Sequence, residues 1–463
     1  MGQSRVIPPR VVIVGAGPAG VRAAETIVAA GLTPVVIDEG RRAGGQIYRR
    51  QPENFRRPYT DLYGTEAERA KSVHDGFDAL RDRIDYRPET LVWNIADGHV
   101  WTASGTAQEA LPYDALILCT GATDRLMPMA GWDLPGTYSM GGSQVALKAQ
   151  AVSIGSQVVF LGTGPLLYLV AAQYIKAGAK VAAVLDTSSF AARITALPDL
   201  LALPSVLWNG IALTRAIQAA GVPLLTGVTP VAIQGDARTG VTGVTVRLRN
   251  GTERSFAADA VAMGYHLRPE TQLADLGRCT FAFDELTRQY LPVRDPDGRA
   301  EAPTKLYLAG DGARVLGARS AEASGRLAAL AALSDLGQPV DRGAIILLRR
   351  EVRRYGRFAR GLAKAFPWPH QQAATLSDDT ILCRCECVTV GDVRRTMAVT
   401  GAAETNRAKA FSRVGMGRCQ GRYCGHAAAE VIAAQGDFPV ADAGRLRGQA
   451  PVKPLPIAIG EAE

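Results

Sequence analysis

The sequence predicts an α/β protein with two dinucleotide-binding (Rossmann-like) domains followed by a small helical domain. An apolar run that ends in glycines occurs at residues 11–20 and again at 158–165, which predicts the two nucleotide-binding domains. Five of the seven cysteines lie in two short segments between Cys383 and Cys424, which predicts a third, cofactor-holding domain. The expected division is 1–125 and 263–340 for the first domain, 126–262 for the second, 341–377 for a linker, 378–440 for the small domain and 441–463 for a tail.

The composition is that of a globular protein and excludes several functions. Hydrophobic residues make up 47% and charged residues 21% of 463 residues. The net charge of +8 is spread over the chain, without the aromatic-interleaved basic run of a nucleic-acid-binding protein. No stretch approaches the roughly 20 apolar residues of a membrane span. We therefore expect no nucleic-acid partner and a cytoplasmic protein, with peripheral contact to the inner membrane as an alternative.

The first apolar run opens a dinucleotide fingerprint. Residues 11–14 predict a buried strand, and G-x-G-x-x-G leads into a helix over 21–30. Gly15 allows the tight turn, Gly17 lets the backbone approach a pyrophosphate, and Gly20 lets the helix pack on the strand. Because glycine interrupts the run so early, it is not a signal peptide. The residues expected at the cofactor are Gly15, Gly17, Pro18, Ala19 and Gly20.

A second strand, over 33–37, ends at Asp38 and Glu39, about twenty residues after the glycines. A carboxylate at this place accepts the ribose hydroxyls, and position favours Asp38. The next segment, with Gly45 and Gln46, resembles the one by which flavoproteins of the thioredoxin-reductase type approach FAD. This resemblance favours FAD over NAD.

Two later strands are expected to complete the FAD domain. An apolar strand over 115–119 ends in a turn containing Gly121, and Cys119 is expected to be a core thiol. The strand and turn over 304–312 resemble the second FAD motif of the same flavoproteins, which implies Gly310 and Asp311 at the flavin's ribityl chain. A helix over 320–336 should follow.

The second fingerprint, at 158–165, departs from the first. Its third glycine is replaced by Leu167, while a strand over 180–185 still ends in Asp186. NAD(P) binding is therefore in doubt, and another adenine nucleotide or a purely structural role is equally compatible. Residues 241–248 predict a hairpin strand, and 260–265 should return the chain to the FAD domain. No Cys-x-x-Cys follows, which excludes dithiol chemistry.

The clustered cysteines predict a [2Fe-2S] centre, because thiolates are the usual ligands of iron–sulfur clusters. Such a cluster takes four thiolates, and the sequence offers five candidates in these segments. If 383–387 is extended, alternate side chains share a side, so Cys383, Cys385 and Cys387 could all face the cluster. Spacing alone does not choose among them. A zinc site fits the tight Cys-x-Cys less well, and disulfides are not expected without a secretory signal.

Residues 378–436 resemble the bacterioferritin-associated-ferredoxin-like [2Fe-2S] domain. That domain opens with Cys-x-Cys, two residues and a Val/Ile-Ser/Thr pair, as found here from Cys383 to Thr389. The resemblance makes Cys387 the extra cysteine and implies the ligands Cys383, Cys385, Cys419 and Cys424. The later pair departs from the pattern, with four residues between the cysteines in place of two.

The order of motifs resembles the larger, alpha or A, subunit of multimeric amine-oxidising flavoenzymes. That family includes opine oxidases, proline and hydroxyproline dehydrogenases and hydrogen cyanide synthase. It implies an oxidoreductase acting on CH-NH or CH-NH2 donors through a beta subunit of the D-amino-acid-oxidase type. FMN would lie between the two chains, the family also allows a small third chain, and a quinone or carrier would accept electrons. The five histidines are scattered, so no catalytic residue is predicted.

Two other functions stay open on the sequence. One is a self-contained NAD(P)H-dependent FAD/[2Fe-2S] reductase that uses the second fingerprint, against which Leu167 argues. The other is a scaffold with a structural zinc and no turnover.

Overall fold

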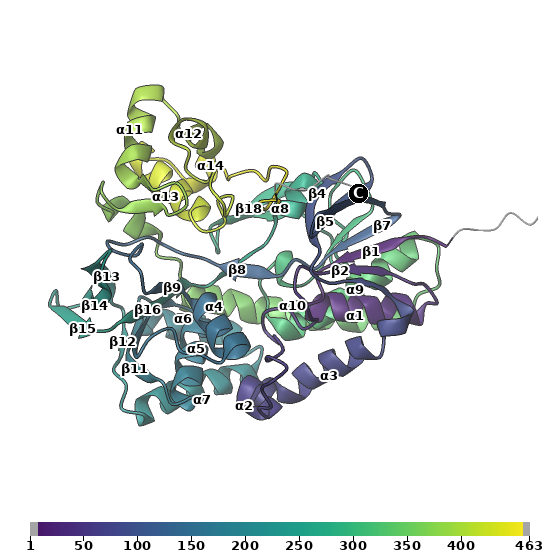
Figure 1. Cartoon of the computed structure of the whole chain (residues 1–463), viewed down its shortest axis with the longest axis horizontal. Coiled ribbons are helices and arrows are strands. Elements are labelled where there is room, and N and C mark those ends of the chain that lie inside the picture. The colour runs from purple at the N-terminus through teal and green to yellow at the C-terminus, as the bar shows by residue number, and fades with distance from the viewer. Residues whose placement is uncertain (1–7, 457–463) are drawn as a thin grey trace, which may run out of the picture.

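We describe residues 8–456 from a computed structural model. Three lobes surround a common centre: two α/β units side by side, and a small, mainly helical unit above them (Figure 1). The short strands β8 (Ala122–Asp124) and β17 (Leu267–Pro269) pair antiparallel and link the two α/β units.

The first unit is built on a five-stranded parallel sheet in the order β20-β7-β1-β2-β3. Its strands are β1 (Val11–Val14), β2 (Val35–Ile37), β3 (Asp85–Arg87), β7 (Ala115–Leu118) and β20 (Leu306–Leu308). Every residue of β1 and β7 is buried, as expected for a parallel sheet covered on both faces. An antiparallel sheet of β4 (Leu91–Ala96), β5 (His99–Ser104) and β6 (Ala107–Pro112) flanks it.

Two helices cover the glycine-bearing edge of this sheet. Helix α1 (Pro18–Ala29) and helix α9 (Ala318–Asp335) pack along each other. A Cβ placed at Gly325 would lie 2.1 Å from the Ala19 carbonyl oxygen, so only glycine permits this approach. The contact brings the start of both helices to the end of β1.

The second unit is also built on a five-stranded parallel sheet. Its parallel sheet has the order β12-β11-β10-β16-β9, with β9 (Thr137–Ser139), β10 (Gln157–Thr163), β11 (Lys180–Asp186), β12 (Leu224–Thr226) and β16 (Ala260–Tyr265). The expectation that 260–265 returns the chain to the FAD domain is wrong, because β16 pairs with β10 in this second sheet. The predicted hairpin is β14 (Gly240–Arg247) and β15 (Glu253–Ala257), joined on its other side by β13 (Thr229–Asp236).

The third unit has one small hairpin and four helices. Strands β21 (Ile381–Cys383) and β22 (Val388–Thr389) precede α11 (Val390–Thr400), α12 (Thr405–Ser412), α13 (Gly425–Gly436) and α14 (Val440–Ala443). Trp132, from the second α/β unit, donates its indole N–H to the Ile381 carbonyl at 2.5 Å and is fully buried there. The unit is thus anchored on the second sheet.

Two segments differ from the expected linker and tail. Most of 341–377 is a long helix, α10 (Arg342–Ala365), capped by the Asp341 side chain and packed against α6 (Phe190–Leu200) and α9. The apolar stripe of α10, which includes the buried Phe358 and Ala365, was not evident in the sequence because basic residues are frequent in this segment. Residues 441–456 lie on this chain itself, with Val452 buried in the core beneath the first sheet. The remainder of the predicted tail lies outside the described residues.

Across residues 8–456 we find no helix both long and apolar enough to cross a bilayer.

Candidate functional site

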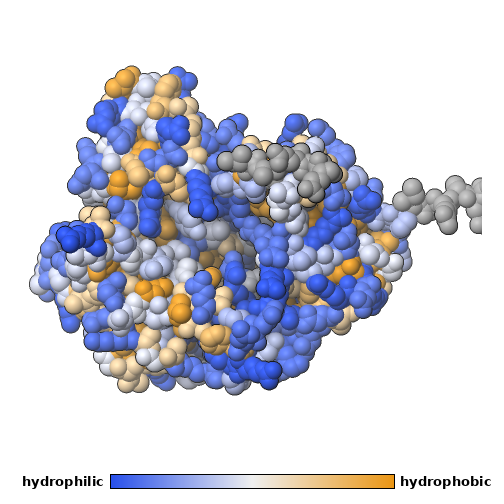
Figure 2. Space-filling model, viewed as in Figure 1, coloured by the Kyte–Doolittle hydropathy of each residue, from blue (hydrophilic) through white to orange (hydrophobic). Residues whose placement is uncertain are grey.

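One cavity of about 2320 Å³ lies between the three units, where the molecular surface is hollowed (Figure 2). A typical ligand pocket holds about 300–1,000 Å³, so this cavity has room for more than one ligand. Its wall includes residues of the first fingerprint, Pro165 at the end of the second fingerprint, and all four cysteines expected as ligands.

The first fingerprint forms a loop that only glycine permits. Gly15 has φ +103°, and a Cβ there would lie 2.3 Å from the Cys119 carbonyl oxygen. A Cβ at Gly20 would lie 1.8 Å from the Gly15 carbonyl oxygen. At Gly17 the nearest atom to a Cβ would be Gly45 Cα at 3.7 Å, so the missing side chain leaves the loop open to the cavity.

The N-terminus of α1 meets the cavity without a capping side chain. No side chain accepts a hydrogen bond from its first turn, and no acidic residue lies there. The free N–H groups and the helix dipole together favour an anion at this place. The glycine loop and the uncapped helix therefore fit the pyrophosphate of FAD.

The two acidic residues after β2 have different environments. Asp38 accepts hydrogen bonds from the Ala16 amide at 2.5 Å and the Gly40 amide at 2.6 Å. Burial raises the pKa of Asp38 above its ordinary value, although both amides lower it. Glu39 is exposed and forms an ion pair with Lys453. Both carboxylates line the cavity, but only Asp38 is held there by backbone amides of the glycine loop and the turn after β2.

The remaining residues predicted for FAD line the same cavity. Gly310 and Asp311 form a short 3-10 turn directly after β20, and Asp311 accepts from the amides of Leu316 and Gly317, each at 2.9 Å. Burial raises the pKa of Asp311. The other lining residues predicted from sequence are Pro18, Ala19, Gly45, Gln46 and Gly121. Cys119 is buried, as predicted for a core thiol.

The second fingerprint uses its acid internally. Asp186 is fully buried at the end of β11, where Thr163 and Tyr168 donate hydroxyl hydrogen bonds to it at 2.8 and 2.7 Å. Arg193 donates to the same carboxylate at 2.7 Å, and the Ser188 amide does so at 2.7 Å. These four donors already occupy the Asp186 carboxylate, which would otherwise accept hydrogen bonds from ribose hydroxyls. Leu167, which replaces the third glycine, is buried in the core against β10.

Four of the five candidate thiols contact one another in the third unit. Cys424 is hydrogen-bonded to Cys383 and to Cys419, and Cys419 also to Cys385. Within residues 8–456 no group of three or more His, Cys, Asp or Glu side chains could hold a metal ion as placed. The contacts nevertheless link all four thiols in one row, from Cys383 through Cys424 and Cys419 to Cys385.

Backbone amides surround two of these sulfur atoms. The Cys424 thiol and the amides of Gly415, Glu386 and Cys385 lower the pKa of Cys383 to about 6, against burial. Cys419 has a pKa lowered to about 5, first by the Cys424 thiol and then by amides that outweigh burial. Thiolate is the form that binds iron, so this environment suits a cluster ligand.

The structure separates Cys387 from the other cysteines. The segment 383–387 is not extended, because β21 ends at Cys383 and a turn follows in which Cys387 has φ +53°. Cys387 is exposed, and its thiol lies 4.0 Å from the Arg384 carbonyl oxygen. The alternation that would place three thiols on one side is thereby lost.

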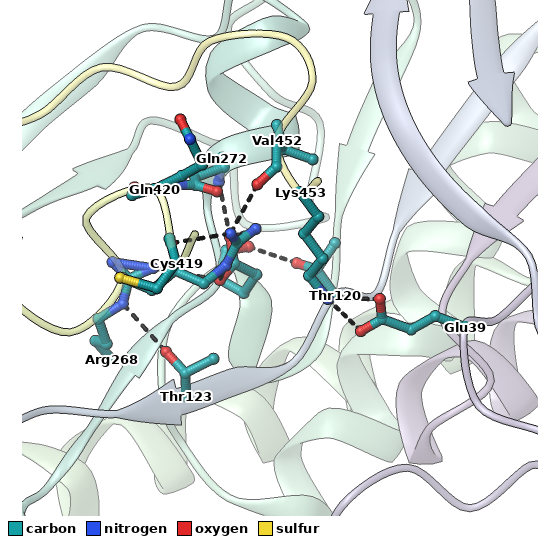
Figure 3. A network of polar contacts seen from close by, with 11 residues as sticks. Glu39, Thr120, Thr123, Arg268, Gln272, Cys419, Gln420, Val452 and Lys453 are labelled. Atoms are coloured by element: carbon teal, nitrogen blue, oxygen red, sulfur yellow. Dashed lines mark hydrogen bonds and ion pairs between the residues drawn. The ribbon is translucent and has the colours of Figure 1, made fainter. Parts of the chain in front are cut away.

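A polar network, which the sequence did not reveal, joins the cysteine loop to the first fingerprint's side of the cavity (Figure 3). Arg422 donates to Glu270 at 2.8 Å and to the Cys419 carbonyl at 3.2 Å. Thr120, beside Gly121, donates to the Glu270 carbonyl at 2.6 Å. The network thus connects a candidate iron ligand to the turn predicted for the flavin through two residues.

The sequence matches known families over most of its length. Residues 9–329 match the pyridine nucleotide-disulphide oxidoreductase family, and residues 380–463 match the sarcosine oxidase A3 domain, which extends past the expected boundary at 440. The A subunit of opine oxidase from Rhizobium meliloti is 37% identical, covering 97% of this chain and 86% of that protein. The HcnB subunit of hydrogen cyanide synthase from Pseudomonas aeruginosa is 31% identical, covering 97% of each.

Solved structures show the same fold. L-proline dehydrogenase from P. horikoshii superposes with a TM-score of 0.72 at 18% identity, covering 98% of this chain and 80% of that one. Thioredoxin reductase of T. acidophilum has a TM-score of 0.51 at 23% identity, covering 72% of this chain and 100% of that one. The predicted architecture of two dinucleotide-binding units with a helical C-terminal unit is confirmed.

Proposed function

Because the chain belongs to the pyridine nucleotide-disulphide oxidoreductase family, and within it to the group that includes the A subunit of opine oxidase, we propose that it transfers electrons within a heteromeric amino-acid or opine oxidoreductase. FAD would be held by the first fingerprint with Asp38 and Asp311. A [2Fe-2S] cluster would be held by Cys383, Cys385, Cys419 and Cys424.

One observation carries this proposal: the four contacting thiols and the flavin-type fingerprint line the same cavity. A [2Fe-2S] centre takes four protein thiolates, which is the number of thiols that contact one another here. A flavin takes up two electrons together, whereas a cluster passes one at a time. A chain that holds both is suited to connect a two-electron reaction to another carrier.

The oxidation of substrate is proposed to occur on another chain. A beta subunit of the D-amino-acid-oxidase type would oxidise the amine, with FMN at the shared surface and room in the assembly for a small third chain. Support for these partners comes from the family resemblance and from the relatives' names, which describe them as subunits. The substrate is an amino acid or opine in this proposal.

The geometry disfavours a self-contained NAD(P)H reductase. At the second fingerprint, the carboxylate that would accept ribose hydroxyls already accepts from Thr163, Tyr168 and Arg193. Binding NADH there would have to break a buried, charge-assisted network, which costs several kcal/mol (roughly 3–5). We therefore expect NADH to be a poor reductant of this chain.

The proposal is tested by anaerobic absorption and electron paramagnetic resonance spectra of the purified chain, before and after NADH and then dithionite. We expect flavin and iron–sulfur bands that NADH leaves unchanged and dithionite bleaches. Bleaching by NADH within seconds would overturn the relay assignment in favour of a reductase. A preparation that contains zinc and no iron would overturn the assignment of an iron–sulfur cluster. Co-expression with a D-amino-acid-oxidase-like chain should yield a complex that bleaches on addition of its amine.

A further inference from the structure

The cavity continues from the two fingerprints into an apolar branch among helices of the second unit. This branch runs between α5 (Pro165–Lys176), α6, α7 (Pro204–Ala219) and α10. Aliphatic side chains dominate its wall, among them Leu166, Leu169, Leu207, Ile211 and Leu362. A wall of this kind binds apolar groups and offers little to a nucleotide.

The mouth of the branch carries an exposed apolar stripe. Along α6 and its C-terminal turn, Phe190, Ile194, Leu197 and Leu201 are 62%, 59%, 43% and 55% exposed. Their spacing of four, three and four residues places them on one helix face. Trp208, at the start of α7, is 63% exposed. Figure 2 shows apolar surface over the lobe that holds these helices. Exposed apolar patches of this kind mark binding surfaces.

Basic residues border the stripe. Exposed Arg354 and Arg357 of α10 donate to the carbonyls of Ala202 and Pro198 at 2.8 and 3.0 Å, which fixes α10 beside the end of α6. The exposed cations along this part of α10 are Arg350, Arg353, Arg354, Arg357, Arg360 and Lys364, of which Arg357 and Lys364 also pair with Asp199 of α6. An apolar helix face beside a cationic one is the pattern of a surface that meets anionic lipid, from which a lipophilic ligand would enter.

We propose that this branch binds the tail of a membrane quinone, a long isoprenoid chain on a redox-active ring. Three observations support it: the apolar wall, the apolar mouth beside cations, and the continuity of the branch with the cavity that holds the flavin-type fingerprint. The naming of a quinone rests on the proposed electron-transfer function, which requires an acceptor. The inference that the branch binds a long apolar chain does not rest on that function.

The test is a fluorescence titration of the purified full-length chain with decylubiquinone and with the same ring lacking its tail. Quinones quench nearby tryptophan, and Trp208 adjoins Leu207 of the branch wall, so Trp208→Phe should reduce the saturable quenching, while Trp132 and Trp368 in the rest of the cavity wall still report binding. We expect the decyl compound to bind at least about 100-fold more tightly, because burial of only about three or four of its CH2 groups, at roughly 0.8 kcal/mol each, gives that factor. Leu197→Arg should weaken that binding at least about tenfold, because it puts a charge at the apolar mouth.

The matched control is Val399→Arg on α11, where an equally apolar side chain is 80% exposed and distant in the fold. It should leave quinone binding unchanged. Equal affinity for the two quinones, or quenching unaffected by Leu197→Arg, would overturn the proposal. So would a dimer in sedimentation that dissociates in Leu197→Arg without any tail preference, which would assign the stripe to a second copy. The readout needs neither flavin nor iron, so its failure is distinct from failure of the electron-transfer proposal.

Discussion

The buried pair of Arg422 and Glu270 is expected to be a principal tie between the third unit and the flavin side of the cavity. Their side chains are only 8% and 12% exposed, and Arg422 Nε lies 2.8 Å from the carboxylate. Arg268 approaches the same carboxylate at 3.3 Å. Glu270→Ala would leave two guanidinium groups in the interior without their counter-charge. We expect a loss of about 3–5 kcal/mol in the free energy of unfolding, the usual result of removing one partner of a buried pair.

Urea unfolding followed by fluorescence measures this loss. The matched control is Arg247→Ala, which breaks an exposed pair with Glu253, both side chains being about half exposed (52% and 48%). That change should cost less than about 1 kcal/mol. Replacing both Arg422 and Glu270 with leucine should cost less than Glu270→Ala, because only the Arg268 guanidinium then lacks its counter-charge, in place of two guanidinium groups. A cost below about 1 kcal/mol for Glu270→Ala would refute the reasoning.

The same pair predicts a pH dependence. Burial raises the pKa of Glu270, but the charges of Arg268 and Arg422 outweigh it and hold the pKa below its ordinary value. A carboxyl whose pKa is lower in the folded state contributes stability above its unfolded pKa of about 4.3, and this is lost as the pH falls. The difference in stability between wild type and Glu270→Ala should therefore shrink below about pH 4.3. A constant difference down to pH 3 would contradict this assignment.

Three further changes test the site. Gly20→Val, whose Cβ would lie 1.8 Å from a carbonyl oxygen of the loop, should reduce flavin bound to the purified chain more than about tenfold, whereas Gly210→Ala, in open space, should not. Cys419→Ser should abolish bound iron and the cluster bands, and Cys387→Ser should retain both; equal iron in the two proteins would contradict the ligand set. Asp186→Ala should lower the free energy of unfolding by about 3–5 kcal/mol, because its buried donors lose their acceptor, and should leave NADH binding absent.

Local patterns in the sequence were sufficient for the central strands of the first sheet and for the first fingerprint. The strands at Val11–Val14 and Ala115–Leu118 are short apolar runs whose ends are marked by glycine, and such signals depend only on neighbouring residues. The same holds for Asp38, which the spacing from the glycines favoured over Glu39. Both residues line the cavity, but Asp38 is held by two backbone amides whereas Glu39 is exposed and paired with Lys453.

What the sequence could not predict depends on distant partners. The ion pair of Lys453 and Glu39 joins residues 414 positions apart, and no local pattern marks it. The composition predicts a linker where helix α10 lies, because charged residues dominate that segment, although the apolar stripe needed to pack on α6 is present. The hydrogen bonds that Tyr168 and Arg193 donate to Asp186 could not be predicted either, because neither residue belongs to a recognisable motif.

The contact between Lys453 and Glu39 has a consequence for how the protein acquires its nucleotide during synthesis. At about 5–20 residues per second, the ribosome needs roughly 20–80 s to add the 414 residues that separate the two. The first unit is complete only when α9 has been made, and the 118 residues from Asp335 to Lys453 take roughly 6–24 s at the same rate. In that shorter interval the first unit can fold and take up its cofactor with the rim beside Glu39 uncovered. Once Lys453 has been made and pairs with Glu39, the adjoining Val452 packs in the core beneath the first sheet. Exchange of the cofactor would then first require this C-terminal segment to detach.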